Sequence, residues 1–285
     1  MHFDGRCELI FTMLDLGSIR LFLFDIDGVF LVGKDQPRLL SGRRIVAALR
    51  ERRLPFRLVT NTSTHPREYI AENLGQLGVF VDAEEILSAV ETTVSVAARR
   101  FRGSRCFAVA EPPVRAMLDA AGLQLVDEAP ADVVVVGLCR TADYKMLSAA
   151  ARCLARGATL LGCHKNRLWL DETGYGLSAG PWVAALEYAT NTRAEIFGKP
   201  TAEFFDEARR PLAVPAEQTL MIGDDVVADV RGAQAAGLRA GLVLSGKTRH
   251  EDLRAVPAEP DLVLNEVDDL ADLLEGGTSS ADAST

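Results

Sequence analysis

Cysteine and histidine are scarce in this sequence, and neither residue type is grouped. The cysteines include no CxxC pair and no regular spacing, so we expect reduced thiols that serve as small core residues and not a disulfide framework. They are Cys7, Cys106, Cys139, Cys153 and Cys163. The four histidines are equally scattered, which argues against a histidine-based zinc site. They are His2, His65, His164 and His250.

Long hydrophobic runs are also missing. No apolar segment approaches the length that a membrane span needs. The first residues, MHFDGRCELIFTML, carry acidic side chains where a signal peptide would be basic and then apolar. We therefore expect a cytoplasmic protein that has no membrane as a partner.

Positive charge is in deficit. The sequence has 31 basic and 40 acidic side chains, which give a net charge of −9, and it contains no strongly basic stripe. We therefore expect no nucleic-acid partner, because nucleic-acid-binding proteins gather lysine and arginine on one face. A small anionic ligand would need a locally positive site, since the overall field does not attract it.

What is present is an alternation of short β-rich runs and longer amphipathic stretches. The chain has 285 residues, of which 48% are apolar and 25% are charged, as in an ordinary globular protein. Residues 19–25 and 55–61 predict strands. Residues 41–53 and 65–78 predict helices, the first with Ser41 as its N-cap.

The C-terminal part continues this alternation. Residues 218–225 and 239–246 predict strands, and residues 227–237 predict a helix between them. The segment DLVLNEVDDLADLLE then gives a last strand and helix. Because these strands are bulky and do not alternate in polarity, they indicate a parallel sheet covered on both faces. The predicted fold class is α/β, with a doubly wound parallel sheet.

The middle of the chain predicts a unit of its own. Residues 104–110, 131–138 and 158–164 read as strands with helices between them. The simplest organisation is a second α/β domain inserted into the first. We expect a core formed by residues 1–87 and 187–275, an inserted domain over 88–186, and a disordered polar tail over 276–285.

Polar residues follow several of the predicted strands. In an open parallel sheet, the loops after the carboxyl ends of the strands gather in one crevice, where ligands bind. The residues in question are Asp25 and Asp27, Thr60 and Asn61, Lys199, and Asp224, Asp225 and Asp229. One crevice would thus collect several carboxylates, one lysine, one hydroxyl and one amide.

This set of side chains suits phosphoryl transfer. A carboxylate attacks phosphorus to form an aspartyl-phosphate, and Mg²⁺ held by carboxylates relieves their mutual repulsion. A lysine and a hydroxyl stabilise the charge on the transferring phosphoryl group. A second carboxylic acid protonates the leaving oxygen and then activates water. The spacing of Asp25 and Asp27 fits this division of work.

Four motifs, DIDGV, VTNTS, GKP and GDDVVAD, resemble in this order the motifs of the haloacid dehalogenase (HAD) superfamily. The segment between Asp27 and Thr60 is too short for a cap domain, whereas the segment from Thr60 to Lys199 is long enough, as in subgroup IIA. The resemblance covers residues 19–275. It implies a Rossmann-like core with an inserted α/β cap and Mg²⁺-dependent hydrolysis of a phosphorylated substrate.

The resemblance also implies roles for the acidic residues. Asp25 matches the nucleophile and a magnesium ligand. Asp27 matches the general acid and base, with its backbone carbonyl on the metal. Asp224 matches the metal ligand of the fourth motif, and Asp229 its supporting carboxylate. Asp225 lies where members of the superfamily vary, so we give it no role.

The remaining motif residues match groups that hold phosphate. Thr60 and Asn61 correspond to the second motif, and Lys199 to the lysine of the third. A cap of this kind favours small phosphorylated molecules, and relatives often form homodimers through it. His164 and Asn166 lie in the insertion, where a substrate-facing role and an ordinary loop role are equally good interpretations.

Three alternatives compete with a phosphatase. Residues 241–248, GLVLSGKT, satisfy the P-loop pattern of NTPases and kinases, but 242–244 are themselves predicted strand, so we do not favour this interpretation. A dehalogenase would need no magnesium and typically lacks the second aspartate, Asp27. A non-catalytic binding protein on the same scaffold would be expected to have lost a main site residue, and none is missing.

Two matters stay open at this point. Cap loops select the leaving group, so a phosphoester, a phosphoramidate and pyrophosphate are all compatible with the motifs. Residues 1–18 have no counterpart in the resemblance, and Met13 is a candidate first residue.

Overall fold

A computed structural model describes residues 14–33, 37–171, 174–255 and 259–276, and these form two compact units. The first unit comprises the described residues of Met1–Val32, Arg38–Arg57 and Arg209–Thr285. The second comprises those of Gly33–Pro37 and Leu58–Ala208. Of the tail expected to be disordered, 276–285, Gly276 is the last residue of a helix, and 277–285 lie outside the described residues, as do Cys7 and Met13.

The first unit is built on parallel strands in the order β15-β14-β13-β1. They are β1 (Leu21–Phe24), β13 (Thr219–Gly223), β14 (Arg239–Val243) and β15 (Leu262–Leu264). Phe22 donates its N–H to the carbonyl of Pro55 (3.1 Å), just before β4 (Phe56–Thr60) begins. A short antiparallel hairpin is formed by β2 (Leu31–Val32) and β3 (Arg38–Leu39). The buried apolar strands account for the strand predictions at 19–25, 218–225 and 239–246.

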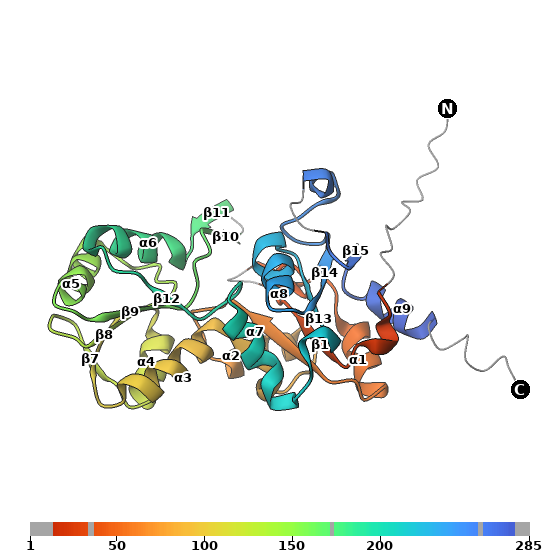
Figure 1. Cartoon of the computed structure of the whole chain (residues 1–285), viewed down its shortest axis with the longest axis horizontal. Coiled ribbons are helices and arrows are strands. Elements are labelled where there is room, and N and C mark those ends of the chain that lie inside the picture. Colours follow the sequence, from red (N-terminus) through yellow and green to blue (C-terminus); the bar gives the residue numbers. More distant parts are fainter. Residues whose placement is uncertain (1–13, 34–36, 172–173, 256–258, 277–285) are drawn as a thin grey trace, which may run out of the picture. The chain divides into compact units, whose positions relative to one another are not determined.

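The helices of the first unit include α1 and α9, which lie side by side (Figure 1). The helices of this unit are α1 (Arg43–Glu51), α8 (Gly232–Ala235) and α9 (Asp269–Gly276). The prediction of Ser41 as an N-cap is wrong, because Gly42 takes that position at φ 115°. Asp268, just before α9, explains the difference: its carboxylate accepts the N–H of Ile45 (2.8 Å) and its own N–H donates to Ser41 Oγ (3.2 Å).

The helix predicted at 227–237 is present but divided. Val226–Arg231 is a π-helical segment, and α8 follows it directly. The wide turn arises because the carbonyl of Asp225 accepts both Asp229 N–H (2.9 Å) and Val230 N–H (3.3 Å). Wide turns of this kind occur often at functional sites.

The second unit contains a larger parallel sheet in the order β12-β9-β8-β6-β7. Its strands are β6 (Arg105–Val109), β7 (Gln124–Val126), β8 (Val133–Val136), β9 (Thr159–Gly162) and β12 (Glu195–Ile196). In the same unit the end of β4 pairs in parallel with β5 (Ile86–Ser88). An antiparallel hairpin of β10 (Leu168–Asp171) and β11 (Gly174–Leu177) follows β9 along the chain.

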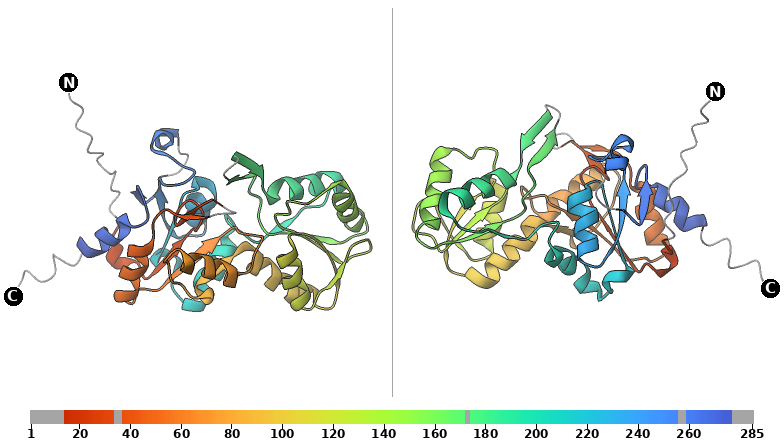
Figure 2. Two further views of the ribbon diagram at one scale, coloured as in Figure 1. Left: turned by 180° about the vertical axis from the view of Figure 1, so that it is seen from behind. Right: turned by 45° about the horizontal axis from the view of Figure 1, so that its top comes forward.

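Helices cover both faces of the five-stranded sheet, as Figures 1 and 2 show. The helices assigned to the second unit are α2 (Arg67–Gln76), α3 (Ala89–Phe101), α4 (Pro112–Ala120), α5 (Tyr144–Leu154), α6 (Ala179–Thr190) and α7 (Ala202–Arg209). Along β8, Val133 and Val135 pack with α3 and α4, whereas Val134 and Val136 pack with α5 and α6. This strand is apolar on both faces because both faces are covered. The predicted α/β class is confirmed.

Candidate active site

Three buried aspartates meet in the first unit and form what we call the acidic cluster: Asp25, Asp224 and Asp229. Each offers one carboxylate oxygen, and these oxygens lie within 4.8 Å of one another. Asp25 follows β1, and Asp224 follows β13, its parallel neighbour. The N–H of Asp25 donates to Ile222 (2.9 Å) and so extends the ladder between the two strands. Adjacent parallel strands thus deliver carboxylates from distant parts of the sequence to one place.

Asp224 is a deeply buried member of the acidic cluster. Its side chain is 1% exposed, and Oδ2 accepts the N–H of Lys247 (2.8 Å). Burial, opposed by the charge of Lys247 and assisted by that of Asp229, raises the pKa of Asp224 to about 7. A buried carboxylate among like charges favours its neutral form unless a cation compensates it.

Glycines leave room for the carboxylates of the acidic cluster. A Cβ atom on Gly28 or on Gly246 would lie 2.0 Å from Asp224 Oδ2, and Gly28 also has a φ of +82°. A Cβ atom on Gly223 would lie 2.1 Å from Asp229 Oδ2. At these positions only hydrogen fits beside the carboxylate oxygens.

Asp229 and Asp225 are joined through the π-helical segment. Asp229 is fully buried, and its Oδ2 accepts the N–H of Asp225 (3.0 Å). Asp225 Oδ1 caps the segment by accepting the N–H groups of Val227 and Ala228, each at 3.0 Å. Burial raises the pKa of Asp225, but the charge of Lys247 and these N–H donors outweigh burial and lower it overall. Asp225, which received no role from the sequence, thus supports the loop.

Asp27 lies in a tight turn after β1. The carbonyl of Ile26 accepts the N–H groups of Phe30 (2.9 Å) and Leu31 (3.0 Å), and Gly28 N–H donates to the carbonyl of Leu31 (2.7 Å). Asp27 is partly exposed and forms an isolated bridge with Leu31. Its side chain is not one of the three that form the acidic cluster. Its role as acid and base stays a prediction.

Thr60, Asn61 and Lys199 belong to the second unit, where Asn61 and Lys199 are paired. Lys199 N–H donates to Asn61 Oδ1 (2.8 Å), and Asn61 Nδ2 donates back to the carbonyl of Lys199 (3.0 Å). Lys199 is 1% exposed, and its Nζ donates to the carbonyl of Val59 (3.3 Å). Thr60 is equally buried, and its Oγ1 accepts the N–H of Thr62 (3.0 Å). The second and third motifs are therefore held together by an amide pair.

The acidic cluster fits a hard divalent cation. Asp224 Oδ1 is buried and has no hydrogen-bond partner within the part of the chain that the structure describes. Burying a charged carboxylate oxygen without a partner destabilises the fold unless a cation compensates its charge. Mg²⁺ binds through one or two carboxylates together with water, and Asp25, Asp224 and Asp229 supply oxygens of this chemistry within 4.8 Å.

The loop after β14 contributes Lys247, which lies outside the four motifs. Lys247 Nζ donates to Asp225 Oδ2 (2.9 Å), and burial of the lysine is outweighed by Asp224, Asp225 and Asp25, which raise its pKa. Thr248 Oγ1 donates to the carbonyl of Asp224 (2.8 Å). The signal was available in the sequence, because GKT follows the carboxyl end of a strand beside β13.

The structure of the same loop argues against the P-loop interpretation of residues 241–248. Gly241 and Leu242 lie inside β14, where they pair with Ile222 and Gly223 on one side and with Leu262 and Val263 on the other. A P-loop needs free backbone N–H groups after the strand to curl around phosphate. Here the lysine and threonine of the pattern bind the loop that carries Asp224.

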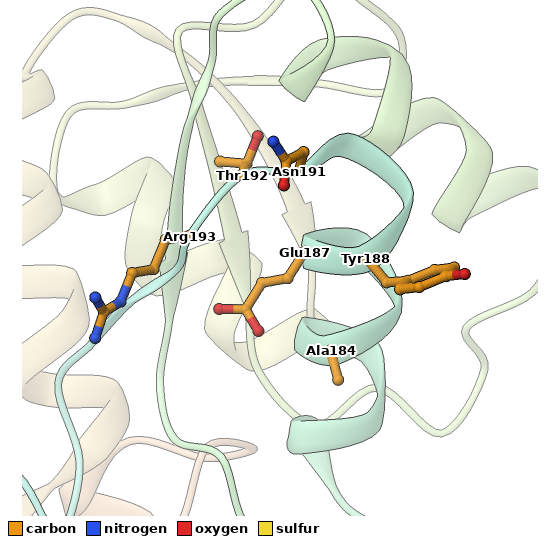
Figure 3. Close-up of a pocket in the computed structure, with 6 residues that line it drawn as sticks. All are labelled: Ala184, Glu187, Tyr188, Asn191, Thr192 and Arg193. Atoms are coloured by element: carbon orange, nitrogen blue, oxygen red, sulfur yellow. The ribbon is translucent and has the colours of Figure 1, made fainter.

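A pocket in the second unit has no part in this chemistry. Figure 3 shows six residues that line it at the end of α6: Ala184, Glu187, Tyr188, Asn191, Thr192 and Arg193. The carboxylate of Glu187 accepts hydrogen bonds from Lys165 Nζ (2.7 Å) and from the N–H of Ala194 (3.0 Å), so it already has partners. None of the predicted site residues lines this pocket.

Known proteins resemble this chain over most of its length. Residues 22–124 match the sequence profile of haloacid dehalogenase-like hydrolases, and residues 196–273 match a profile described as HAD-hydrolase-like. The phospholysine phosphohistidine inorganic pyrophosphate phosphatase of Homo sapiens is 31% identical over 263 residues, which are 91% of this chain and 95% of that protein. This chain belongs to the haloacid dehalogenase-like hydrolases. The resemblance inferred from the four motifs is confirmed.

Solved structures of this hydrolase family agree with the fold. The p-nitrophenyl phosphatase from Archaeoglobus fulgidus superposes with a TM-score of 0.83 at 29% identity, over 90% of this chain and 99% of that one. A glycerol phosphate phosphatase from Mycobacterium tuberculosis, solved in complex with magnesium, gives a TM-score of 0.77 at 26% identity, over 88% and 76% of the two chains. In the described part of this hydrolase, no helix has both the length and the apolar character of a membrane span.

Proposed function

We propose that this hydrolase is a Mg²⁺-dependent phosphatase that acts on small phosphorylated molecules through an aspartyl-phosphate on Asp25. The observation that carries the proposal is the acidic cluster, three buried carboxylates within 4.8 Å at the ends of adjacent parallel strands. Similarity to phosphatases of known structure supports the reaction class. Asp25, Asp224 and the backbone carbonyl of Asp27 are assigned to the metal, and Asp229 supports them.

Bound Mg²⁺ would offset the negative charge of the acidic cluster and of an incoming phosphate. The Asp25 carboxylate then attacks phosphorus, and the bond from phosphorus to the leaving oxygen breaks. Asp27 gives its proton to that oxygen. In the second half, Asp27 takes a proton from water, whose oxygen attacks the phosphorus of the aspartyl-phosphate. Phosphate leaves, and the Asp25 carboxylate is restored.

Thr60, Asn61 and Lys199 are assigned to the phosphoryl oxygens. The Thr60 hydroxyl and the Lys199 ammonium are the side-chain donors that such oxygens need as charge develops on them. Asn61 would contribute its backbone N–H, because both hydrogens of its side-chain amide are donated to the Lys199 carbonyl and to Asn166 Oδ1. The buried position of Lys199 and the amide pair that fixes its backbone support this assignment. The ammonium of a lysine forms strong, charge-assisted hydrogen bonds to phosphoryl oxygens.

The inserted segment 88–186 is assigned to substrate selection, as a cap in the sense of subgroup IIA. We propose that it favours small molecules over folded phosphoproteins. The homodimer through the cap, the cytoplasmic location and the absence of a nucleic-acid or membrane partner stay predictions. Size-exclusion chromatography with light scattering tests the dimer directly.

Hydrolysis of p-nitrophenyl phosphate tests the proposed reaction. We expect the purified protein to release p-nitrophenol with Mg²⁺ and to stop when EDTA is added. The rate of phosphate release from a sugar phosphate, a phosphoramidate and pyrophosphate then ranks these three substrate classes. Absence of phosphate release from the whole panel at saturating Mg²⁺ would overturn the proposal.

A further inference from the structure

Two hydrogen bonds within the second unit join the loop after β4 to the loop after β9. Asn61 Nδ2 donates to Asn166 Oδ1 (3.1 Å), and Ser63 Oγ lies 3.0 Å from His164 Nε2. The partners are about a hundred residues apart in the sequence. The sequence alone is equally compatible with a substrate-facing role and an ordinary loop role for His164 and Asn166, and these contacts bear on that choice.

The hydrogen bond that Asn61 donates to Asn166 completes the hydrogen bonding of the Asn61 amide. Asn61 Oδ1 must face Lys199, because it accepts the Lys199 N–H at 2.8 Å. Its Nδ2 then has two hydrogens, one for the Lys199 carbonyl (3.0 Å) and one for Asn166 Oδ1 (3.1 Å). Asn166 therefore presents its oxygen, and both amide orientations follow from the network.

His164 fixes the other end of the same loop. The imidazole is 3% exposed, and its Nδ1 accepts the N–H of Asn166 (3.2 Å). A neutral ring that accepts at Nδ1 carries its proton on Nε2, so Nε2 donates to Ser63 Oγ. Ser63 Oγ also accepts the N–H of Leu138 (3.0 Å). One imidazole thus links Asn166 to Ser63.

The loop that carries His164 and Asn166 has firm support from α6. The carbonyl of Asn166 accepts the N–H of Gly180 (3.0 Å), in the first turn of that helix. A Cβ atom on Gly180 would lie 2.5 Å from the carbonyl oxygen of Lys165 and 2.6 Å from that of Asn166. The helix backbone therefore packs directly on the loop.

We propose that Asn166 and His164 are positioning residues of the phosphatase. Asn166 orients the Asn61 amide, and through it the backbone of Lys199, while His164 holds Ser63 in the same loop. This inference rests on the proposed function, since it gives the two residues the task of arranging the groups assigned to phosphate. Supporting residues of this kind hold a site to the accuracy that catalysis requires.

Asn166 offers the sharper test because it is only partly buried, so the fold should tolerate its substitution. Asn166→Leu keeps the size of the side chain and removes the acceptor, whereas Asn166→Asp keeps an acceptor oxygen. Lys165→Ala is the matched control, because this exposed neighbour contacts Glu187 and not the Asn61 loop. Two readouts are compared, namely amide hydrogen exchange at Lys199 and steady-state hydrolysis of p-nitrophenyl phosphate with Mg²⁺.

For Asn166→Leu we expect Lys199 exchange to quicken by about three- to tenfold, the effect of losing one neutral hydrogen bond. We expect kcat/KM to fall by a similar factor, mainly through kcat, with both values recovered in Asn166→Asp and unchanged in Lys165→Ala. Unchanged exchange at Lys199 in Asn166→Leu would overturn the inference, even if the melting temperature fell. If the wild type hydrolysed nothing, the proposed function would fail, and Lys199 exchange would still decide whether Asn166 orients Asn61.

Discussion

Replacing Asp224 by asparagine should stabilise the metal-free protein and abolish its response to Mg²⁺. The carboxylate is 1% exposed, its Oδ1 has no hydrogen-bond partner among the described residues, and Asp25 and Asp229 lie beside it. Asparagine has nearly the same shape, keeps an acceptor for the N–H of Lys247, and carries no charge. The acidic cluster is thus a case in which function costs stability.

The size of the effect follows from the pKa of Asp224, which burial raises from an ordinary 3.8 to about 7. A folded pKa above the unfolded one means that ionisation opposes folding. The cost is absent below about pH 4 and complete above about pH 7. At about 1.4 kcal/mol per pH unit it has an upper bound of about 4 kcal/mol, and relaxation around the carboxylate lowers it. We expect a gain of about 1 to 4 kcal/mol for Asp224→Asn at pH 8.

Thermal unfolding in EDTA measures this difference. At pH 8 the melting temperature of Asp224→Asn should exceed that of the wild type by about 3 to 10 °C, and the gap should close toward pH 4.5. Added Mg²⁺ should raise the melting temperature of the wild type only, because only its acidic cluster binds the ion. A variant that is less stable than the wild type in EDTA at pH 8 would refute this account of the buried carboxylate.

Three further predictions concern the surroundings of the acidic cluster and the core. Gly246→Ala should weaken Mg²⁺ binding at least about tenfold in calorimetric titration, because its Cβ would lie 2.0 Å from Asp224 Oδ2, and unchanged affinity would contradict this packing. Lys247→Met should destabilise the EDTA-treated protein by about 1 kcal/mol, a small value because the lysine side chain is 48% exposed. Mg²⁺ should narrow the difference in melting temperature between the variant and the wild type. A melting temperature that is unchanged in EDTA would count against the ion pair with Asp225. Burial raises the pKa of Cys163 to about 11 and that of Cys106 to about 12, so a thiol reagent at pH 8 should modify neither before unfolding, and rapid labelling of either in the native protein would contradict their burial.

The parts of the fold that follow from local physics were predictable from the sequence. Bulky runs such as LFLF and VVVV are buried on both faces and became β1 and β8. The meeting of Asp25 with Asp224 was predictable as well, because each follows a parallel strand and such ends share one edge of a sheet.

What the sequence did not disclose depends on contacts between distant residues. Ser41 is a good N-cap by type, but Asp268 caps α1 from the other end of the chain. Lys247 was read within a local pattern, although its partners are Asp224 and Asp225. No spacing rule pairs Asn61 with Asn166, since the contact exists only after the inserted strands have folded.

The most direct test of the central claim is the hydrolysis of p-nitrophenyl phosphate by Asp25→Asn in saturating Mg²⁺. Asp225→Asn is the matched control, because this neighbouring carboxylate is assigned to the loop and not to the chemistry. We predict that Asp25→Asn loses at least about a thousandfold in kcat/KM while it melts near the wild-type temperature, and that Asp225→Asn stays within about tenfold. A folded Asp25→Asn protein with wild-type turnover would contradict the assignment of Asp25 as the nucleophile.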